Sequence, residues 1–223
     1  MPKETIKDKI IVALDMPDFG RAKKLVKLLY PKIKIFKVGS QLFTMRGPDA
    51  VQMVKDVGAE VFLDLKFFDI PNTVANAVKE AVKLDVFMLT LHITGGDAML
   101  KAAVEARNSE AELLNKRRPL LVGVTVLTSQ SVSAQHVLRL AKIGLGCGLD
   151  GIVCSAREAA SLRKEIKRDF LIVTPGIRLE DSKRDDQKRV ATIEEAIKAG
   201  SDYLVIGRPI VEARFPLNVI KDL

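Results

Sequence analysis

The sequence predicts an α/β protein with a single (β/α)8 TIM barrel that extends over residues 1–223. Short apolar runs alternate strictly with amphipathic helical patterns, which is typical of a parallel sheet. Eight such runs in 223 residues give about 28 residues per βα unit, near the short end of the size range of these barrels. Because no linker or change in composition divides the chain, we expect one domain. The alternative is a doubly wound open sheet, which shares the same alternation.

The predicted strands are short and mainly apolar, as expected for strands that are buried on both faces. In chain order, they cover residues 10–14, 33–38, 61–65, 87–92, 120–125, 151–154, 171–174 and 203–206. Helical periodicity predicts helices between them, over residues 21–29, 49–57, 73–83, 97–106, 134–143, 157–167 and 193–199.

Local signals mark the ends of several predicted helices. Asp18 can accept a hydrogen bond at the start of the first helix, and Thr192 with Glu195 forms the pattern of a capping box. Three glycines stand where a helix commonly ends in a left-handed residue: Gly58, Gly144 and Gly200.

The charge of the chain favours small anionic ligands over nucleic acid. The net charge is +8, from 36 basic and 28 acidic residues. The basic residues are scattered along helical patterns among acidic ones, and no basic run carries interleaved aromatic residues for base stacking. We therefore expect no nucleic-acid partner, whereas a positive surface can attract anionic metabolites.

The sequence also predicts a cytoplasmic protein without a membrane partner. The charged N-terminal segment lacks the apolar region of a signal peptide, and no apolar run approaches the 18 residues of a membrane-spanning helix. Cys147 and Cys154 have no metal-ligand companions at useful spacing, so we interpret them as free thiols in a reducing compartment.

Residues 61–73 form the most informative segment for function. An apolar strand ends in three charges of alternating sign, Asp64, Lys66 and Asp69. Residues i and i+2 of a strand project to the same side, so Asp64 and Lys66 are expected to lie together. An alternating cluster in a cleft is a candidate for proton-transfer chemistry, and the alternative is a structural ion pair.

Further polar residues fall at the carboxyl ends of the other predicted strands, where the active sites of these barrels lie. Asp15 follows the first strand and Lys37 closes the second, so two acids and two lysines converge from the first three strands. The later strands are followed by Thr125, Thr128, Pro175, Gly176, Gly207 and Arg208.

Several motifs resemble the orotidine 5′-phosphate decarboxylase family over essentially the whole chain. They are LDLKFFDIPNTV at 63–74, TVLTS at 125–129, VTPGIR at 173–178, Gln187 nine residues beyond Arg178, and IGRPI at 206–210. The resemblance implies decarboxylation of orotidine 5′-phosphate to UMP and CO2 in de novo pyrimidine biosynthesis. It also implies a reaction without cofactor or metal.

A sister group with the same Asp-x-Lys-x-x-Asp signature uses magnesium to act on sugar phosphates. In those relatives a glutamate at the end of the second strand helps to hold the metal, whereas this chain has Lys37 at that position. A protonated lysine cannot bind Mg²⁺ and repels it. Lys37 therefore favours the orotidylate branch, and the magnesium-dependent enzymes and a non-catalytic basic barrel remain as alternatives.

The resemblance assigns roles to individual residues. Lys37, Asp64, Lys66 and Asp69 form the catalytic set, with Lys66 as the proton donor to C6 of the pyrimidine and Asp64 close to the substrate carboxylate. Asp69 belongs with Ile70 and Thr73 to a segment that enters the site of the partner subunit, so a homodimer is expected.

The remaining assignments concern substrate binding. Asp15 and Lys37 are expected at the ribose hydroxyls and Thr128 at the pyrimidine, with Ser129 as a weaker candidate. The phosphate is assigned to Arg178, Gln187, the Gly207 backbone and Arg208, a set of donors that suits a dianion. Residues 178–190 are expected to form a lid over the phosphate.

Overall fold

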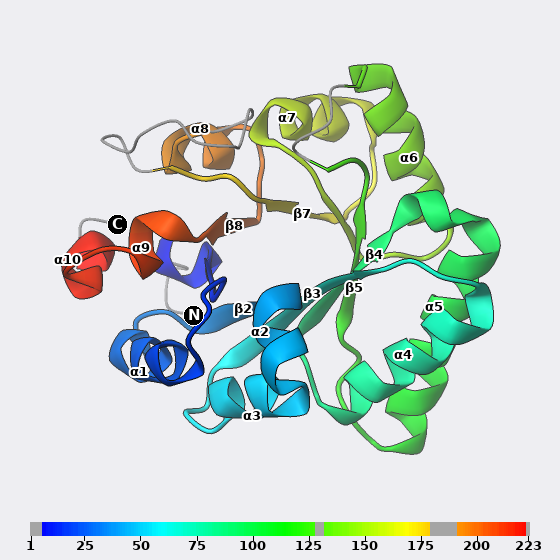
Figure 1. Cartoon of the computed structure of the whole chain (residues 1–223). Helices are drawn as coiled ribbons and strands as arrows, with labels where there is room; N and C mark the ends of the chain where they lie inside the picture. Colours follow the sequence, from blue (N-terminus) through cyan, green and yellow to red (C-terminus); the bar gives the residue numbers. More distant parts are fainter. Residues whose placement is uncertain (1–5, 128–131, 179–190, 222–223) are drawn as a thin grey trace.

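The computed structural model describes residues 6–127, 132–178 and 191–221, and within them a closed parallel barrel (Figure 1). Each strand pairs in parallel with its neighbours in sequence, and β1 closes the barrel against β8. The predicted barrel is thereby confirmed, and the open-sheet alternative is wrong, because an open sheet leaves its edge strands unpaired. The strands are β1 (Ile10–Ala13), β2 (Ile35–Gly39), β3 (Glu60–Phe67), β4 (Met88–His92), β5 (Leu120–Val124), β6 (Gly151–Val153), β7 (Leu171–Thr174) and β8 (Tyr203–Ile206).

Helices surround the barrel, and the second βα unit carries two of them. The helices are α1 (Phe19–Leu29), α2 (Ser40–Arg46), α3 (Pro48–Lys55), α4 (Pro71–Lys83), α5 (Gly96–Leu113), α6 (Ala134–Gly146), α7 (Ala156–Glu165), α8 (Ile193–Lys198), α9 (Arg208–Val211) and α10 (Pro216–Lys221). Short 3₁₀ turns, η1 (Ile6–Lys9) and η2 (Ile93–Gly95), precede β1 and α5. The sequence did not predict α2, α9 or α10. No helix in the described ranges is long and apolar enough to cross a membrane.

The predicted starts of two helices are confirmed. The Asp18 carboxylate accepts a hydrogen bond from the backbone N–H of Arg21 at 2.9 Å. Thr192 and Glu195 exchange side-chain and backbone hydrogen bonds at the start of α8, which is a complete capping box.

Two of the three predicted helix-ending glycines are left-handed, and one prediction is wrong. Gly58 and Gly200 have φ angles of +86° and +94°. Gly144 instead lies inside α6, which continues to Gly146. A Cβ atom at Gly144 would lie 2.9 Å from the Ile93 side chain, so this glycine serves close packing rather than helix termination.

Two apolar layers hold the barrel together. The larger one lies between the strands and the surrounding helices, and includes Phe36, Leu63 and Leu89. The smaller one fills the barrel interior with side chains from seven of the eight strands: Ile11, Ala13, Ile35, Phe62, Met88, Val122, Val173 and Val205. Within the described residues, this interior cluster is a packed plug, so a ligand site in the barrel is expected at the carboxyl ends of the strands.

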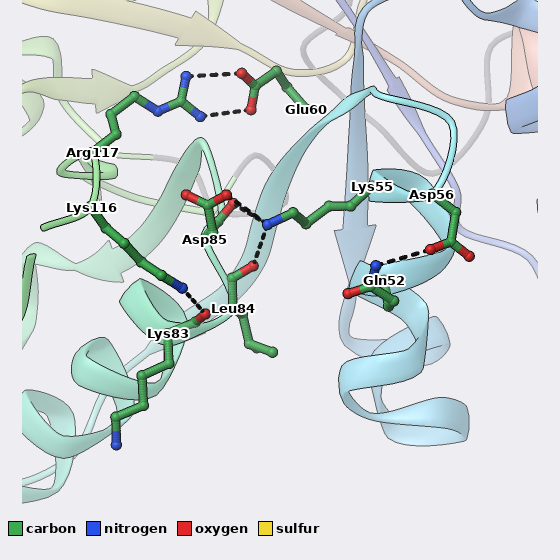
Figure 2. Close-up of polar contacts among 9 residues, drawn as sticks. All are labelled: Gln52, Lys55, Asp56, Glu60, Lys83, Leu84, Asp85, Lys116 and Arg117. Carbon is green, nitrogen blue, oxygen red and sulfur yellow. Dashed lines mark hydrogen bonds and ion pairs between the residues drawn. The ribbon is translucent and has the colours of Figure 1, made fainter. Parts of the chain in front are cut away.

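The opposite end of the barrel carries ion pairs that connect neighbouring loops (Figure 2). Arg117, just before β5, forms two parallel hydrogen bonds of 2.8 and 2.7 Å with Glu60 at the start of β3. Lys55 at the end of α3 contacts the Asp85 carboxylate at 2.7 Å and the Leu84 carbonyl at 3.1 Å. These contacts join the second, third and fourth βα units at the end that does not carry the cavity, which is the end expected to serve stability.

Candidate active site

A cavity of about 430 Å³ opens at the carboxyl ends of the strands. Its volume falls within the usual range for small-ligand sites, roughly 300–1,000 Å³. Its wall combines charged and apolar residues, and the apolar ones include Val124 of β5, Val153 of β6 and Val205 of β8. The charged lining residues are Asp15, Lys37, Asp64, Lys66, Arg178, Arg208 and Glu212.

The four charged residues predicted from the first three strands form a continuous row. The Lys37 ammonium contacts both oxygens of Asp15, at 2.9 and 3.0 Å, and Asp64 Oδ2 at 3.3 Å. The Lys66 ammonium donates to Asp64 Oδ1 at 2.9 Å. Negative and positive charges therefore alternate along the row, which is the arrangement in which charge can be buried.

Both central members of the row remain ionised despite their burial. Burial alone would lower the pKa of Lys37, but Asp64 and Asp15 outweigh it and hold that pKa above its ordinary value. Burial alone would raise the pKa of Asp64, but Lys37 and Lys66 hold it below the ordinary value of an aspartate. The side chains of Lys37 and Asp64 are only 9% and 13% exposed, whereas that of Lys66 is 36% exposed and can meet a ligand.

Strand β3 is irregular at Lys66, the residue whose side chain contacts Asp64. The simple alternation of strand residues did not predict this irregularity. The pairing of β3 with β4 shifts register between Leu63 and Phe67, and Lys66 has a left-handed φ of +52°. Its backbone N–H donates to the Thr90 hydroxyl at 2.8 Å, and that hydroxyl donates to Asp64 Oδ1 at 3.0 Å. Sequence reasoning missed Thr90, although a threonine inside the apolar run MLTLH is the signal that could have found it.

Gly39 is a second residue that the sequence analysis missed. A Cβ atom at this position, the last of β2, would lie 2.6 Å from Asp15 Oδ1 and 2.9 Å from Lys37 Nζ. Only glycine leaves room for the Asp15–Lys37 ion pair in this geometry. No sequence signal marked it, because the conflict arises from two side chains on different strands.

The residues assigned to the phosphate lie at the β7 and β8 side of the cavity. Arg178, Gly207 and Arg208 all line it. The Nε and Nη2 atoms of Arg178 are buried and have no hydrogen-bond partner within the described part of the chain. Buried donors without acceptors are costly, so an anion at this point would stabilise them. Gln187, Thr128, Ser129 and residues 179–190 of the expected lid lie outside the described residues.

The segment assigned to the partner subunit does not line the cavity of its own chain. Asp69, Ile70 and Thr73 are exposed, and Ile70 is 66% exposed. The Asp69 carboxylate accepts a hydrogen bond of 2.6 Å from the backbone N–H of Ile70. The neighbouring Phe68 is exposed as well and contacts the ring of His92 edge-on, with the ring centroids 5.8 Å apart.

His92, at the end of β4, does not line the cavity, and burial together with the Lys66 charge lowers its pKa. Cys147 and Cys154 are both buried free thiols, and burial raises the pKa of each.

Among the residues that the structure describes, no three His, Cys, Asp or Glu side chains form a group that could hold a metal ion. Asp15 and Asp64 face the Lys37 ammonium between them, which does not fit a divalent cation.

Comparison with known proteins identifies the family of this chain. Residues 8–223 match the model of the "Orotidine 5′-phosphate decarboxylase / HUMPS family". The chain belongs to this family. An orotidine 5′-phosphate decarboxylase of Moorella thermoacetica is 49% identical over 95% of this chain and 88% of its own length. One of Coxiella burnetii is 46% identical over 96% of this chain and 94% of its own length.

A solved structure supports both the family and the fold. The crystal structure of orotidine 5′-phosphate decarboxylase from Lactobacillus acidophilus is 35% identical and superposes with a TM-score of 0.84, covering 96% of each chain. The predicted resemblance and the predicted enzyme class, a carboxy-lyase of the orotidine 5′-phosphate decarboxylase family, are confirmed.

Proposed function

We propose that this chain converts orotidine 5′-phosphate to UMP and CO2 without a cofactor or metal ion, with Lys66 as the proton donor. The observation that carries the proposal is the row Asp15–Lys37–Asp64–Lys66, which presents a partly exposed ammonium in a cavity that also holds two arginines. Family membership and the names of the relatives support the same substrate.

The reaction requires a positively charged group next to one carbon atom of the substrate, C6 of the pyrimidine. When the bond between C6 and the carboxylate breaks, CO2 leaves and an electron pair remains on C6 without an adjacent carbonyl to accept it. The Lys66 ammonium stabilises this pair and then transfers a proton to C6, which gives UMP and a neutral amine that solvent reprotonates. Enzymes typically lower barriers by about 8–23 kcal/mol, and here fixed charges and positioning have to supply that amount.

Asp64 pairs with the Lys66 ammonium and orients it. Its two carboxylate oxygens accept from Lys66 and Thr90 on one side and face Lys37 on the other. A carboxylate with three partners that is only 13% exposed is fixed in place, so it fixes the direction of the ammonium. Its negative charge also lies beside the expected position of the substrate carboxylate.

The other substrate groups are assigned by charge and position. Asp15 and Lys37 bind the ribose hydroxyls, and Thr128 binds the pyrimidine. The phosphate is bound by Arg178 and Arg208, together with Gln187 and the backbone N–H of Gly207. The unpaired Arg178 donors support the phosphate position, because a dianion supplies the acceptors that they lack.

The proposed active form is a homodimer in which Asp69, Ile70 and Thr73 complete the partner's site. Their exposure, and the exposure of Phe68 next to them, support a surface that a second copy covers. Mixing inactive Asp64→Asn and Asp69→Asn variants should restore part of the activity, since a hybrid dimer contains one site with both aspartates intact. Absence of any rescue after confirmed subunit exchange would contradict the shared site.

The proposed reaction is tested by the ultraviolet absorbance of orotidine 5′-phosphate with purified protein in excess EDTA. Stoichiometric conversion to UMP and CO2 is the expected result, and it would also establish independence from divalent metals. No conversion in EDTA, with turnover of hexulose or keto-gulonate phosphates after addition of Mg²⁺, would instead support the magnesium-dependent branch.

A further inference from the structure

One buried hydroxyl, that of Thr90, contacts both Asp64 and the backbone of Lys66 but does not line the cavity. Thr90 is the middle residue of β4 and is 1% exposed. Its Oγ1 accepts a hydrogen bond from the Lys66 backbone N–H at 2.8 Å and donates one to Asp64 Oδ1 at 3.0 Å. The same carboxylate oxygen receives the Lys66 ammonium at 2.9 Å. Thr90 thus contacts both the backbone of Lys66 and the anion that orients its side chain.

The strand pairing explains why this position needs a hydroxyl group. Leu63 pairs with Leu89 and Phe67 pairs with Leu91, so three residues of β3 lie opposite Thr90 alone. The extra residues interrupt the ladder, and Lys66 takes a left-handed conformation that non-glycine residues rarely adopt. A Lys66 N–H without a sheet acceptor would be costly, and the Thr90 hydroxyl replaces that acceptor.

We propose that Thr90 is a positioning residue for the decarboxylation, which fixes the bulge in β3 and thereby the reach and direction of the Lys66 ammonium. The inference rests on the proposed function of Lys66. Both functions of the hydroxyl are needed at once, because it accepts from one group and donates to the other. Valine has the same shape but can do neither, whereas serine can do both.

Thr174 offers a matched control elsewhere in the barrel. It is 0% exposed, and its hydroxyl lies 2.6 Å from that of Ser201, but its side chain does not line the cavity. Thr174→Val therefore removes a buried threonine hydroxyl bond without touching the charged row. Any loss of activity that comes only from lower stability will occur in Thr174→Val and Thr90→Val alike.

The test compares Thr90→Val, Thr90→Ser and Thr174→Val with the wild type. For Thr90→Val, kcat should fall by about 10- to 100-fold, as expected when a reacting group is displaced by a fraction of an ångström to an ångström. Binding of UMP should stay unchanged, because the ribose and phosphate contacts proposed for the nucleotide do not involve Thr90. Thr90→Ser should recover most of kcat, and Thr174→Val should keep kcat at a similar loss of Tm.

Hydrogen exchange of the Lys66 backbone amide provides a readout that does not depend on turnover. We expect slow exchange in the wild type and Thr90→Ser, and faster exchange in Thr90→Val. If Thr90→Val does not fold, Thr90→Ala takes its place in every comparison. A failure of the wild type to decarboxylate orotidine 5′-phosphate would refute the proposed function, and the exchange data would still test the position of Lys66.

Three results would overturn the positioning role. One is a kcat in Thr90→Val close to that of the wild type. Another is a loss in Thr90→Ser as large as that in Thr90→Val, because the hydroxyl would then be irrelevant. The third is a loss of kcat in Thr174→Val of the same size at the same Tm, which would reduce the effect of Thr90 to stability alone.

Discussion

Replacing Lys37 by methionine should destabilise the protein strongly at neutral pH and less in acid. Methionine keeps much of the length of the side chain but removes the ammonium that lies 3.3 Å from Asp64 Oδ2. At an effective dielectric constant of about 20, that separation corresponds to an attraction of about 5 kcal/mol. The loss of this attraction is partly offset for two reasons. Burying methionine does not require removing a charge from water, and Asp64 keeps its contacts with Lys66 and Thr90. Breaking a buried ion pair by removing one partner typically costs about 3–5 kcal/mol. We therefore expect Lys37→Met to lower the free energy of unfolding by about 3 kcal/mol, the low end of that range.

The pH dependence follows from the carboxylate that is left behind. In the wild type the pKa of Asp64 lies below its ordinary value, so its contribution to stability is present above about pH 4 and is lost as the pH falls further. Without Lys37, burial is opposed by fewer charges, and the pKa of Asp64 rises. Protonation then removes the poorly compensated charge from the folded variant. The cost of Lys37→Met should therefore shrink between pH 7 and pH 4.

Urea unfolding followed by far-ultraviolet circular dichroism measures this cost, since the chain has no Trp to report by fluorescence. The protein concentration is held fixed, because the proposed dimer would make stability concentration-dependent. Lys34→Met is the matched control: Lys34 pairs with Asp8 at 2.7 Å on the surface, so its loss should matter far less. A cost for Lys37→Met no larger than that for Lys34→Met, or one that does not change with pH, would refute the reasoning.

Three further substitutions test the site. Lys66→Ala should lower kcat by about 10²–10⁴-fold, the usual contribution of a general acid. Its circular dichroism should stay unchanged, since Lys66 is not part of the apolar core, and near wild-type turnover would end its assignment as proton donor. Arg208→Ala should raise KM for orotidine 5′-phosphate by about 10- to 100-fold, because a hydrogen bond to a charged group contributes about 1.5–3 kcal/mol; an unchanged KM would show that the phosphate binds elsewhere. Gly39→Ala should lower both kcat and Tm, because the added methyl group meets Asp15 Oδ1 at 2.6 Å. A fully active and stable Gly39→Ala variant, measured by turnover and thermal unfolding, would show that the ion pair can shift without consequence.

The sequence predicted the barrel because each strand is an apolar run of its own, and periodicity can identify such runs. Prediction from the sequence failed where the role of a residue depends on contacts with a distant segment of the chain. Gly144 has the sequence context of a helix end, yet it is the contact with Ile93 that requires a glycine there. The short helices α2, α9 and α10 were missed because four to seven residues carry too little periodicity to be recognised.

In the candidate site, too, some residues could be predicted from the sequence and others could not. Asp64 and Lys66 could be predicted to lie together because two residues of one strand fix their spacing. The bulge that turns Lys66 out of the regular strand, and the hydroxyl of Thr90 that supports it, depend on the register between β3 and β4. Gly39 depends on how closely two charged side chains from β1 and β2 approach its backbone. Such requirements exist only once the strands are assembled.

The apolar plug inside the barrel forms a floor beneath the cavity. Phe62 and Met88 are almost fully buried in the interior cluster, so, among the described residues, apolar side chains fill the barrel between the charged row and the opposite end. In the proposed reaction, substrate and products therefore share the route past the carboxyl ends of the strands. CO2 formed beside Asp64 would have to pass the nucleotide or wait until the nucleotide leaves. With a closed floor, any group that covers the carboxyl ends of the strands would control the entry of the substrate and the exit of both products together.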